Sequence, residues 1–312
     1  MSSRAKRKKK KPTWLKVLLS IIVLLIVATG AYAYTVYHSL TSAVETMHSP
    51  LDREKSDKRT DQVSLKQAQP FSVALLGVDQ RPGDRGRADS IIVMAVNPDT
   101  SSVKMLSIPR DTRTEIVGKG TVDKINHSYA FGGVKMSLDT IEKFLDIPID
   151  YYVQVNMEGF KDIVNSVGGV TVNNDLDFTS DGTHFPKGQL TLNGEKALKF
   201  SRMRHEDPRG DFGRQQRQRQ IIQGVINEGA SLSSLTNFSD IFSALGNNVK
   251  TNLTFNEMVT IQSKYKKASK SIDQISVKAQ GTKIDGISYQ LISDEEKARI
   301  HQILVDQLEL KK

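Results

Sequence analysis

Runs of apolar residues, separated by polar turns, divide most of the chain into predicted strands and helices. The near-continuous runs Phe71–Val78, Ser90–Val96 and Val103–Ile108 are typical of strands in a sheet covered on both faces. Further strands are predicted at Tyr151–Val155, Val170–Phe178 (one strand or a short pair), Ile272–Val277 and Ile287–Leu291. Helices are predicted at Asp123–Asp146 (interrupted at Gly132 and Gly133), Asn156–Val167, Asn193–Met203, Asp211–Glu228, Leu232–Leu245, Phe255–Lys266 and Asp294–Leu310. This alternation predicts an α/β fold with helices flanking a central mixed sheet.

A different pattern stands near the N-terminus, where Val17–Val36 contains no charged residue. At about 1.5 Å per residue, this run is long enough to cross a hydrocarbon core of about 30 Å. Trp14 stands at one edge and three tyrosines at the other, as at membrane interfaces, and the preceding lysines and arginines favour a cytoplasmic N-terminus. We therefore expect a single-pass signal-anchor with the C-terminal part outside. A cleaved signal peptide and a buried core helix are the alternatives.

These patterns predict four regions. They are a cytoplasmic basic tail (1–13), a transmembrane anchor (14–37), a polar stalk (38–70) and an extracytoplasmic catalytic domain (71–312). The net charge of +9 belongs mostly to the tail, because eight basic residues precede position 17 and no acidic residue precedes Glu45. The absence of cysteine excludes disulfides and thiolate metal sites.

Two aspartates mark the loop between the first two predicted strands. Asp79 ends the first strand and Asp89 begins the second, so both lie at the same edge of the sheet. Two carboxylates at one edge are suited to Mg²⁺, which uses one or two protein carboxylates and leaves its other positions to water and phosphate. Aspartate is also a common turn residue, which is the alternative.

The third strand is followed by Pro109, Arg110 and Asp111. Ligands of open α/β sheets bind beyond the carboxyl ends of strands, and an arginine placed there can bind phosphate in bidentate fashion. The alternative is a solvated arginine paired with Asp111.

The stretch 201–220 holds six arginines and three acidic residues. At about 100° per residue, the apolar stripe of Ile221, Ile222, Val225 and Ile226 continues backward through Asp211, Arg214 and Gln218, while Arg217 and Arg219 fall to either side. A buried guanidinium requires an anionic partner. A solvated basic face or a nucleic-acid patch is the alternative. Together, the two aspartates and the clustered arginines predict a site for a phosphate anhydride.

Several motifs carry a resemblance to a known family. LLGVD, R-x-DSI, SIPRDT, KINHSYAFGG and SRMRHEDPRGDFGRQQRQRQ resemble, in order, the motifs of the LytR-CpsA-Psr family of cell-wall enzymes, over roughly Phe71–Gly229. The whole chain most resembles the family's teichoic acid transferases. The resemblance implies the α/β sandwich typical of LytR-CpsA-Psr (LCP) proteins, behind an N-terminal anchor in the cell membrane. Residues 231–312 carry no informative motif.

The resemblance also implies a function, which is phosphotransfer of an anionic glycopolymer from a polyprenyl-pyrophosphate carrier to peptidoglycan. It assigns Mg²⁺ (or Mn²⁺) to Asp79 and Asp89. Its pyrophosphate-binding residues would be Arg87, Arg110, Arg202, Arg204, Arg214 and Gln218, with Asp211 orienting the arginines and Lys124 and Asn126 nearby. Either Asp89 or Asp111 is a candidate to accept the hydroxyl proton.

The family's tunnel for the prenyl chain has no identifiable lining in the sequence. Phe131, Phe144, Tyr152 and Phe160 are candidates, although the pattern favours an ordinary core position for each. Two other functions remain open. The first alternative is a membrane-bound transcriptional attenuator that binds nucleic acid. The second is a non-catalytic scaffold that binds lipid pyrophosphate. We expect membrane lipid and peptidoglycan as partners, and no nucleic acid.

Overall fold

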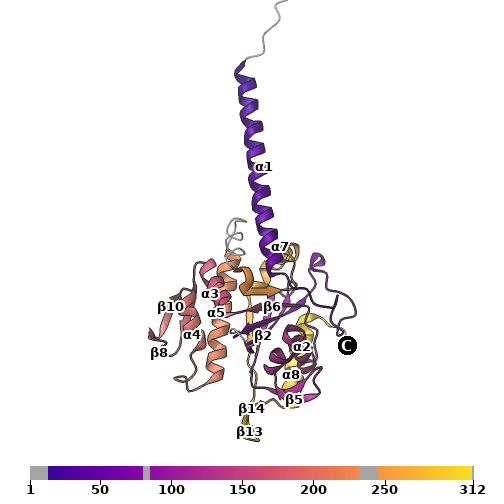
Figure 1. The fold of residues 1–312 in the computed structure, drawn as a ribbon, viewed down its shortest axis with the longest axis vertical. Helices are drawn as coiled ribbons and strands as arrows, with labels where there is room; N and C mark the ends of the chain where they lie inside the picture. The colour runs from indigo at the N-terminus through magenta and orange to yellow at the C-terminus, as the bar shows by residue number, and fades with distance from the viewer. Residues whose placement is uncertain (1–12, 80–84, 232–244, 311–312) are drawn as a thin grey trace, which may run out of the picture.

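A long N-terminal helix extends from a compact body (Figure 1). The structure, a computed structural model, describes residues 13–79, 85–231 and 245–310. The C-terminal part of helix α1 (Thr13–Met47) packs against the body, where Val44 and Met47 are buried with Leu245 and Val249 and the ring of Tyr37 contacts that of Phe255. Within the described residues, no helix combines the length and the apolar character of a membrane-crossing candidate.

A mixed sheet of six strands forms the centre of the body. The strand order is β11-β6-β1-β2-β3-β12. β1 pairs antiparallel with β2 and parallel with β6, and β3 pairs antiparallel with β2 and parallel with β12. The strands are β1 (Phe71–Val78), β2 (Ala88–Asn97), β3 (Ser102–Ile108), β6 (Tyr151–Val155), β11 (Val249–Thr251) and β12 (Ile272–Ile275). The predicted α/β class with a central mixed sheet is therefore confirmed.

One face of the sheet is covered by α2 (His127–Leu145) and α8 (Asp294–Leu308), which bury the largest apolar cluster of the described residues. The predicted interruption of α2 is present, because Gly132 and Gly133 have non-helical backbone angles. Gly133 has φ = 64°, a left-handed conformation that glycine adopts with little strain. The break lets α2 change direction while both halves remain on the sheet.

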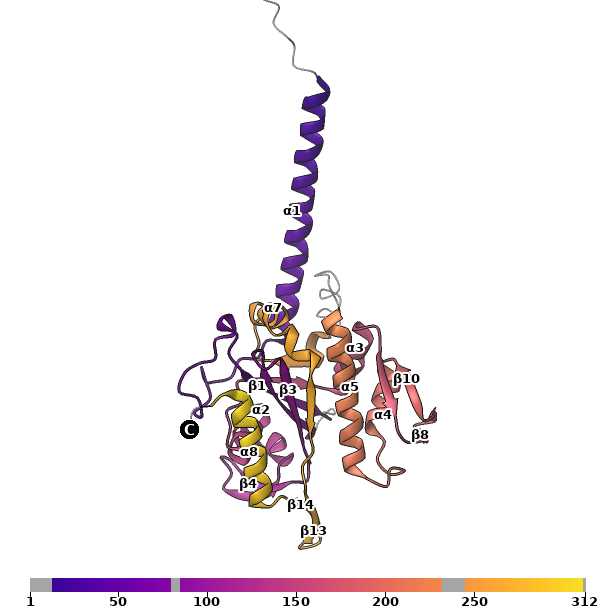
Figure 2. The same cartoon turned by 180° about the vertical axis from the view of Figure 1, so that it is seen from behind.

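The opposite face carries two separate groups of elements, seen together in Figure 2. The strand ends nearest α1 are covered by α7 (Phe255–Lys264) and η3 (Lys266–Lys270). A second lobe contains α3 (Met157–Ser166), α4 (Gly194–Arg202), α5 (Asp211–Ser231), the pair β7 (Val170–Asn174) and β10 (Gly188–Leu192), and the hairpin β8 (Phe178–Ser180) and β9 (Thr183–Phe185). This lobe has its own apolar core, which includes three packed phenylalanines, Phe178, Phe185 and Phe200.

Short elements complete the fold. The sequence did not predict the hairpin of β4 (Arg113–Ile116) with β5 (Thr121–Lys124), nor the strands β9, β10, β11 and β13 (Gln280–Ile284). The remaining elements are η1 (Leu65–Gln67), η2 (Gly246–Asn248) and β14 (Ile287–Leu291), which forms a hairpin with β13. The helix predicted at 232–245 lies outside the described residues except for Leu245, while the other predicted helices of the body are present.

The segment predicted as a polar stalk is packed against the body over much of its length. Arg53 pairs with Glu142 of α2 at 2.7 Å, and Arg59 pairs with Asp150 at 2.8 Å. Leu65 is buried beside the first strand. The prediction of a stalk ending at residue 70 was therefore wrong for residues 53–70. Composition did not reveal that the basic residues of this segment meet acidic partners some ninety positions away.

Helix α5 is fixed to the rest of the second lobe by a buried ion pair. Arg217 is 2% exposed, lies 2.6 Å from a carboxylate oxygen of Asp207, and donates to the backbone carbonyls of Phe200 and Met203. Burial raises the pKa of Asp207, but hydrogen bonds from Arg209 and Arg217 outweigh this and bring it to about 2. The pair thus holds α5 in one rotational setting.

Replacement of Arg217 by methionine should lower the free energy of unfolding by about 3–5 kcal/mol, because a buried carboxylate loses its main partner. Arg209 bonds the same carboxylate from a more exposed position, so Arg209→Met should cost only about 1 kcal/mol. Urea unfolding of the full chain in mild detergent measures both values. Equal losses in the two variants would contradict a special role for the buried pair.

Candidate functional site

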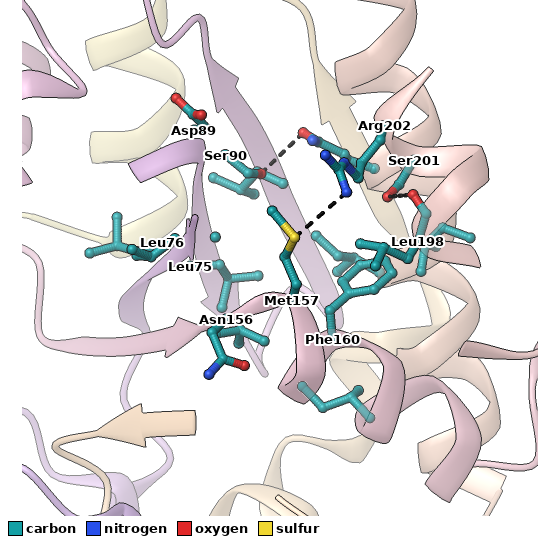
Figure 3. Close-up of a pocket in the computed structure, with 18 of the residues that line it drawn as sticks. Leu75, Leu76, Asp89, Ser90, Asn156, Met157, Phe160, Leu198, Ser201 and Arg202 are labelled. Carbon is teal, nitrogen blue, oxygen red and sulfur yellow. Dashed lines mark hydrogen bonds between the residues drawn. The ribbon is translucent and has the colours of Figure 1, made fainter. Parts of the chain in front are cut away.

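A cavity of about 540 Å³ lies between the sheet and helices α3, α4 and α5. Its floor is the sheet face opposite α2 and α8, and Figure 3 shows side chains from both sides converging on it. The second lobe does not pack directly onto this part of the sheet. The sheet forms one wall of the cavity, and the second lobe forms the opposite wall.

One end of the cavity is polar and contains most of the predicted site residues. Asp79 follows β1, Asp89 lies in β2 and Arg110 follows β3, so three neighbouring strands contribute from one edge. The opposite wall contributes from α4 and α5 and from the turn between them. The predicted residues that line the cavity are Asp79, Asp89, Arg110, Arg202, Arg204, Arg214 and Gln218.

A chain of alternating charges runs along the strand side of the polar end. Arg110 lies 3.1 Å from Asp89 and 3.7 Å from Asp111, and Lys124 lies 2.8 Å from Asp111. Asn126 donates from its amide nitrogen to Asp89 at 3.1 Å. Burial alone would lower the pKa of Arg110, but Asp89 and two further carboxylates raise it above its ordinary value. Arg110 is thus a permanently charged group held in place by acidic residues.

Arg214 completes the charged end from α5. It pairs with Asp211 one turn earlier at 2.6 Å and donates to the backbone carbonyl of Asp89 at 3.3 Å. Burial, with the positive charges of Arg110 and Arg204, lowers the pKa of Arg214 despite these partners. The buried Nε atoms of Arg110 and Arg214 have no hydrogen-bond acceptor among the described residues. Four arginines line the cavity against two aspartates, so its polar end favours an added anion electrostatically.

Two polar contacts join elements that line the cavity. Ser90 on β2 donates to the side-chain oxygen of Gln218 at 3.0 Å, and Arg202 at the end of α4 lies 3.6 Å from the sulfur of Met157 (Figure 3). The Ser90–Gln218 contact joins the sheet to α5, whereas the Arg202–Met157 contact joins α4 to α3 within the second lobe. Ser90 had no functional assignment from the sequence.

Four predicted residues do not line the cavity. Asp111, Asp211 and Lys124 stand behind it and hold or balance the arginines, as their ion pairs show. The side chain of Arg87 is exposed, while its backbone carbonyl accepts the N–H groups of Asp79 and Asp89 at 3.3 and 3.0 Å. Arg87 therefore contributes to the geometry of the aspartates, and direct anion binding by its side chain stays a prediction.

The rest of the cavity is apolar. The stripe predicted on α5 faces it, so that Ile222, Val225 and Ile226 lie opposite Val153 and Val155 of β6. The sequence predicted a core-facing stripe, because an apolar helix face has the same pattern whether it meets a core or a cavity. The other apolar lining residues, which were not identified beforehand, include Leu75, Ile92, Met94, Met157, Ile163 and Leu198.

Of the four aromatic residues considered for an apolar tunnel, only Phe160 lines this cavity. Phe144 and Tyr152 belong to the core on the opposite face of the sheet. Phe131 lies beside His127 on α2, with the Lys119 ammonium 3.0 Å from its ring centroid. The side of its strand or helix on which each residue lies decides whether it can line the cavity. The sequence did not reveal which face of the sheet bears the cavity.

The two aspartates at the polar end have the donor chemistry expected for a divalent cation. Asp79 and Asp89 both line the cavity and flank the same carbonyl of Arg87. No cluster of three or more His, Cys, Asp or Glu residues suited to a metal occurs among the described residues. Magnesium needs only one or two carboxylates when phosphate oxygens complete its shell, so the pair fits that ion.

These features define a class of protein: an α/β protein whose cavity joins an arginine-rich anion site to an apolar chamber, as an amphipathic phosphorylated lipid requires. The family model of the LytR_cpsA_psr family matches residues 34–306. The chain therefore belongs to the LytR-CpsA-Psr family.

Individual relatives agree with this assignment. The polyisoprenyl-teichoic acid–peptidoglycan teichoic acid transferase TagU of Bacillus subtilis (strain 168) is 55% identical over 306 residues, covering 98% of this chain and 99% of the relative. A structure from Enterococcus faecalis described as a transcriptional regulator has a TM-score of 0.74 and 39% identity, covering 80% of this chain and 92% of that one. The family protein YwtF (TagT) with bound octaprenyl pyrophosphate lipid has a TM-score of 0.68 and 29% identity, covering 84% and 100%.

Replacement of Arg214 by glutamine should weaken binding of inorganic pyrophosphate by about tenfold to a hundredfold, because one charged donor is lost from the cavity. Arg209→Gln is the matched control, since Arg209 pairs with Asp175 and Asp207 and does not line the cavity. Isothermal titration calorimetry of the full chain in detergent measures both affinities. Unchanged affinity in Arg214→Gln would remove this residue from the anion site.

Proposed function

We propose that this protein transfers an anionic glycopolymer, with wall teichoic acid the best supported, from a polyprenyl-pyrophosphate carrier to peptidoglycan. The observation that carries the proposal is the division of one cavity into an arginine-rich end and an apolar chamber. A polyprenyl pyrophosphate has the same division, with two phosphates joined to a long hydrocarbon. The names of TagU and of the lipid-bound TagT structure describe the same chemistry in relatives.

The reaction that fits the site is phosphoryl transfer. A hydroxyl oxygen of peptidoglycan attacks the phosphorus that carries the glycopolymer, the bond from that phosphorus to the bridging oxygen breaks, and polyprenyl phosphate leaves. Arg110 and Arg214 bind the phosphate oxygens and stabilise their growing charge, which is most of what such a reaction requires from a protein.

The hydroxyl proton goes to a carboxylate, and Asp89 is the better candidate of the two considered. Asp89 lines the cavity, whereas Asp111 lies behind Arg110 and is paired with Lys124. Arg110 and Asn126 hold one oxygen of Asp89 at 3.1 Å each, which fixes the orientation of the carboxylate. Asp111 serves in this proposal to position Arg110 and Lys124.

Asp79 and Asp89 would hold Mg²⁺ (or Mn²⁺) in this proposal. When bound, the ion would neutralise charge on the phosphate oxygens. The rest of the electrostatic stabilisation comes from the arginines, whose positions the surrounding carboxylates fix.

We also propose that α1 anchors the protein in the cell membrane, with the body outside. Residues 17–36 are uncharged, and the described apolar side chains of this part of α1 are largely exposed, from 46% at Ile22 to 70% at Leu24. In Figure 1 the helix extends away from the body, as an anchor would. This placement brings the cavity to the side of the membrane where lipid-linked glycopolymer and wall meet.

The nucleic-acid alternative rests on the basic stretch at 214–220, and the contacts of that stretch argue against it. Arg217 and Arg219 are 2% and 7% exposed, and Arg214 points its charge into the cavity. These three residues therefore present no basic surface for a phosphate backbone. A non-catalytic scaffold remains distinguishable by experiment, since it binds the lipid without forming a product.

The direct test incubates the full chain in detergent with a lipid-pyrophosphate-linked glycan and peptidoglycan fragments, with Mg²⁺ or with a chelator. We expect covalent glycan–peptidoglycan product together with polyprenyl phosphate, and loss of both with the chelator. Lipid binding without either product would show a scaffold and overturn the transfer proposal. Transfer that is unaffected by the chelator would overturn the metal assignment alone.

Arg110→Ala should reduce transfer by at least about a hundredfold, because the residue binds the reacting phosphates, while the protein stays folded. Product formation and circular dichroism are measured on the same sample. Arg85→Ala is the control, because the side chain of Arg85 is exposed. Arg59 is unsuitable as a control, because its ion pair with Asp150 supports the fold. Full transfer activity in Arg110→Ala would exclude this arginine from the mechanism.

Val225→Trp should fill part of the apolar chamber and weaken binding of a long-chain polyprenyl pyrophosphate by at least about tenfold. Binding of inorganic pyrophosphate should not change, because the polar end is untouched. The exposed Val259 on α7 gives the control Val259→Trp, with the same change outside the cavity. Equal affinity of both variants for the long-chain lipid would show that the chain does not occupy this chamber.

The membrane topology has its own test. External protease added to intact cells should digest the body, while a tag placed before residue 13 should stay protected. Cells opened by detergent provide the control in which both regions are digested. Protection of the body in intact cells would contradict the proposed orientation.

A further inference from the structure

A second groove lies outside the cavity, at the end of the body opposite α1. It is bordered by the β13–β14 hairpin, the first turn of α8, strand β4 and the start of α5 (Figures 1 and 2). The proposed lipid site shares no lining residue with it, while Val277 and Ile292 at its base belong to the core under α2 and α8. Its lining residues come from the part of the chain after residue 270 and from the segments that directly follow site residues.

Two lining residues of the groove neighbour, along the chain, residues that surround the reacting end of the cavity. Arg113 lines it two positions after Asp111, and Phe212 lines it directly after Asp211. The hairpin is attached at the same point, because the N–H of Gln290 donates to the carbonyl of Asp111 at 2.8 Å. The groove is therefore built partly from the same chain segments, around Asp111 and Asp211, that position Arg110 and Arg214.

The lining combines apolar platforms with positive charge. Phe212 and Leu291 are two of the few large apolar residues exposed on the body, at 38% and 37%, and both line the groove. The basic residues are Arg113, Lys278 and Lys297, against the single acidic residue Asp294, which pairs with Lys297 at 3.0 Å. An exposed aromatic ring favours the apolar face of a sugar, and the excess of basic residues favours an acidic ligand.

We propose that this groove binds the acceptor, a peptidoglycan glycan strand with its carboxylate-bearing stem peptides. The proposal rests on the transfer function proposed above and locates its second substrate. Peptidoglycan has the two properties that the lining selects, sugar rings and peptide carboxylates. The position also fits, because the β13–β14 hairpin that borders the groove lies at the end of the body away from α1 (Figure 1), and the groove leaves the apolar chamber to the lipid.

Two lysines of the groove provide the main test, with two lysines elsewhere as a control. Lys278→Gln/Lys297→Gln removes two groove charges, and Lys267→Gln/Lys283→Gln removes two exposed charges outside it. With the full chain in detergent, the groove variant should raise the KM for peptidoglycan fragments about tenfold, with KM for the lipid donor and kcat unchanged. The control should keep all three values.

A second pair of variants tests the apolar platform without altering charge. Leu291→Ala should raise the acceptor KM, and Ile287→Ala, on the same strand but outside the groove, should not. Thermal unfolding confirms that each variant is folded. An acceptor KM that stays at the wild-type value in both groove variants, or that rises equally in the controls, overturns the groove assignment. Wild-type protein that forms no transfer product would overturn the proposed function instead.

Discussion

Crowding of positive charge at one end of a single cavity is the constraint on which the structure of this protein depends. Arg110, Arg204 and Arg214 approach closely enough for the first two to lower the pKa of the third. Such a cluster is stable only because Asp89, Asp111 and Asp211 stand among the guanidinium groups. The carboxylates hold the arginines without accepting a hydrogen bond from every guanidinium N–H group. The site therefore keeps its preference for an anion such as pyrophosphate.

Helix α5 connects this charged site to the rest of the molecule. Its arginines diverge by helical geometry: Arg214 faces the cavity, Arg217 is buried against Asp207, and Arg219 donates to Gln274 of the edge strand β12 at 2.9 Å. The buried contacts set the rotation of the helix, and that rotation aims Arg214 and the apolar residues after it. In sequence this stretch resembles a nucleic-acid-binding patch, but its three arginines have different roles: one lines the cavity, one forms a buried ion pair and one binds the edge strand.

The sequence predicted the central strands and most helices closely, because each has a strong apolar period bounded by clear turn residues. It did not predict the hairpin β4–β5, whose strands are short and largely polar, or the packing of residues 53–70 through Arg53 and Arg59. For the site, the motifs and the helical register singled out Asp79, Asp89, Arg110 and Arg214. The apolar lining was invisible, since Ile92 and Val153 have the same pattern as ordinary core residues.

What the sequence determined by itself was local: where strands begin and end, which residue types stand at their edges, and that the arginines of 201–220 have too few acidic neighbours to be a self-contained network. Tertiary structure alone decided that the second lobe stands off the sheet and leaves a chamber between Val155 and Val225. It also decided that Phe212 and Lys278 share a groove, although they are far apart in the chain. The physical reason is that periodicity records which side of an element is apolar, whereas a cavity depends on the distance between two such sides.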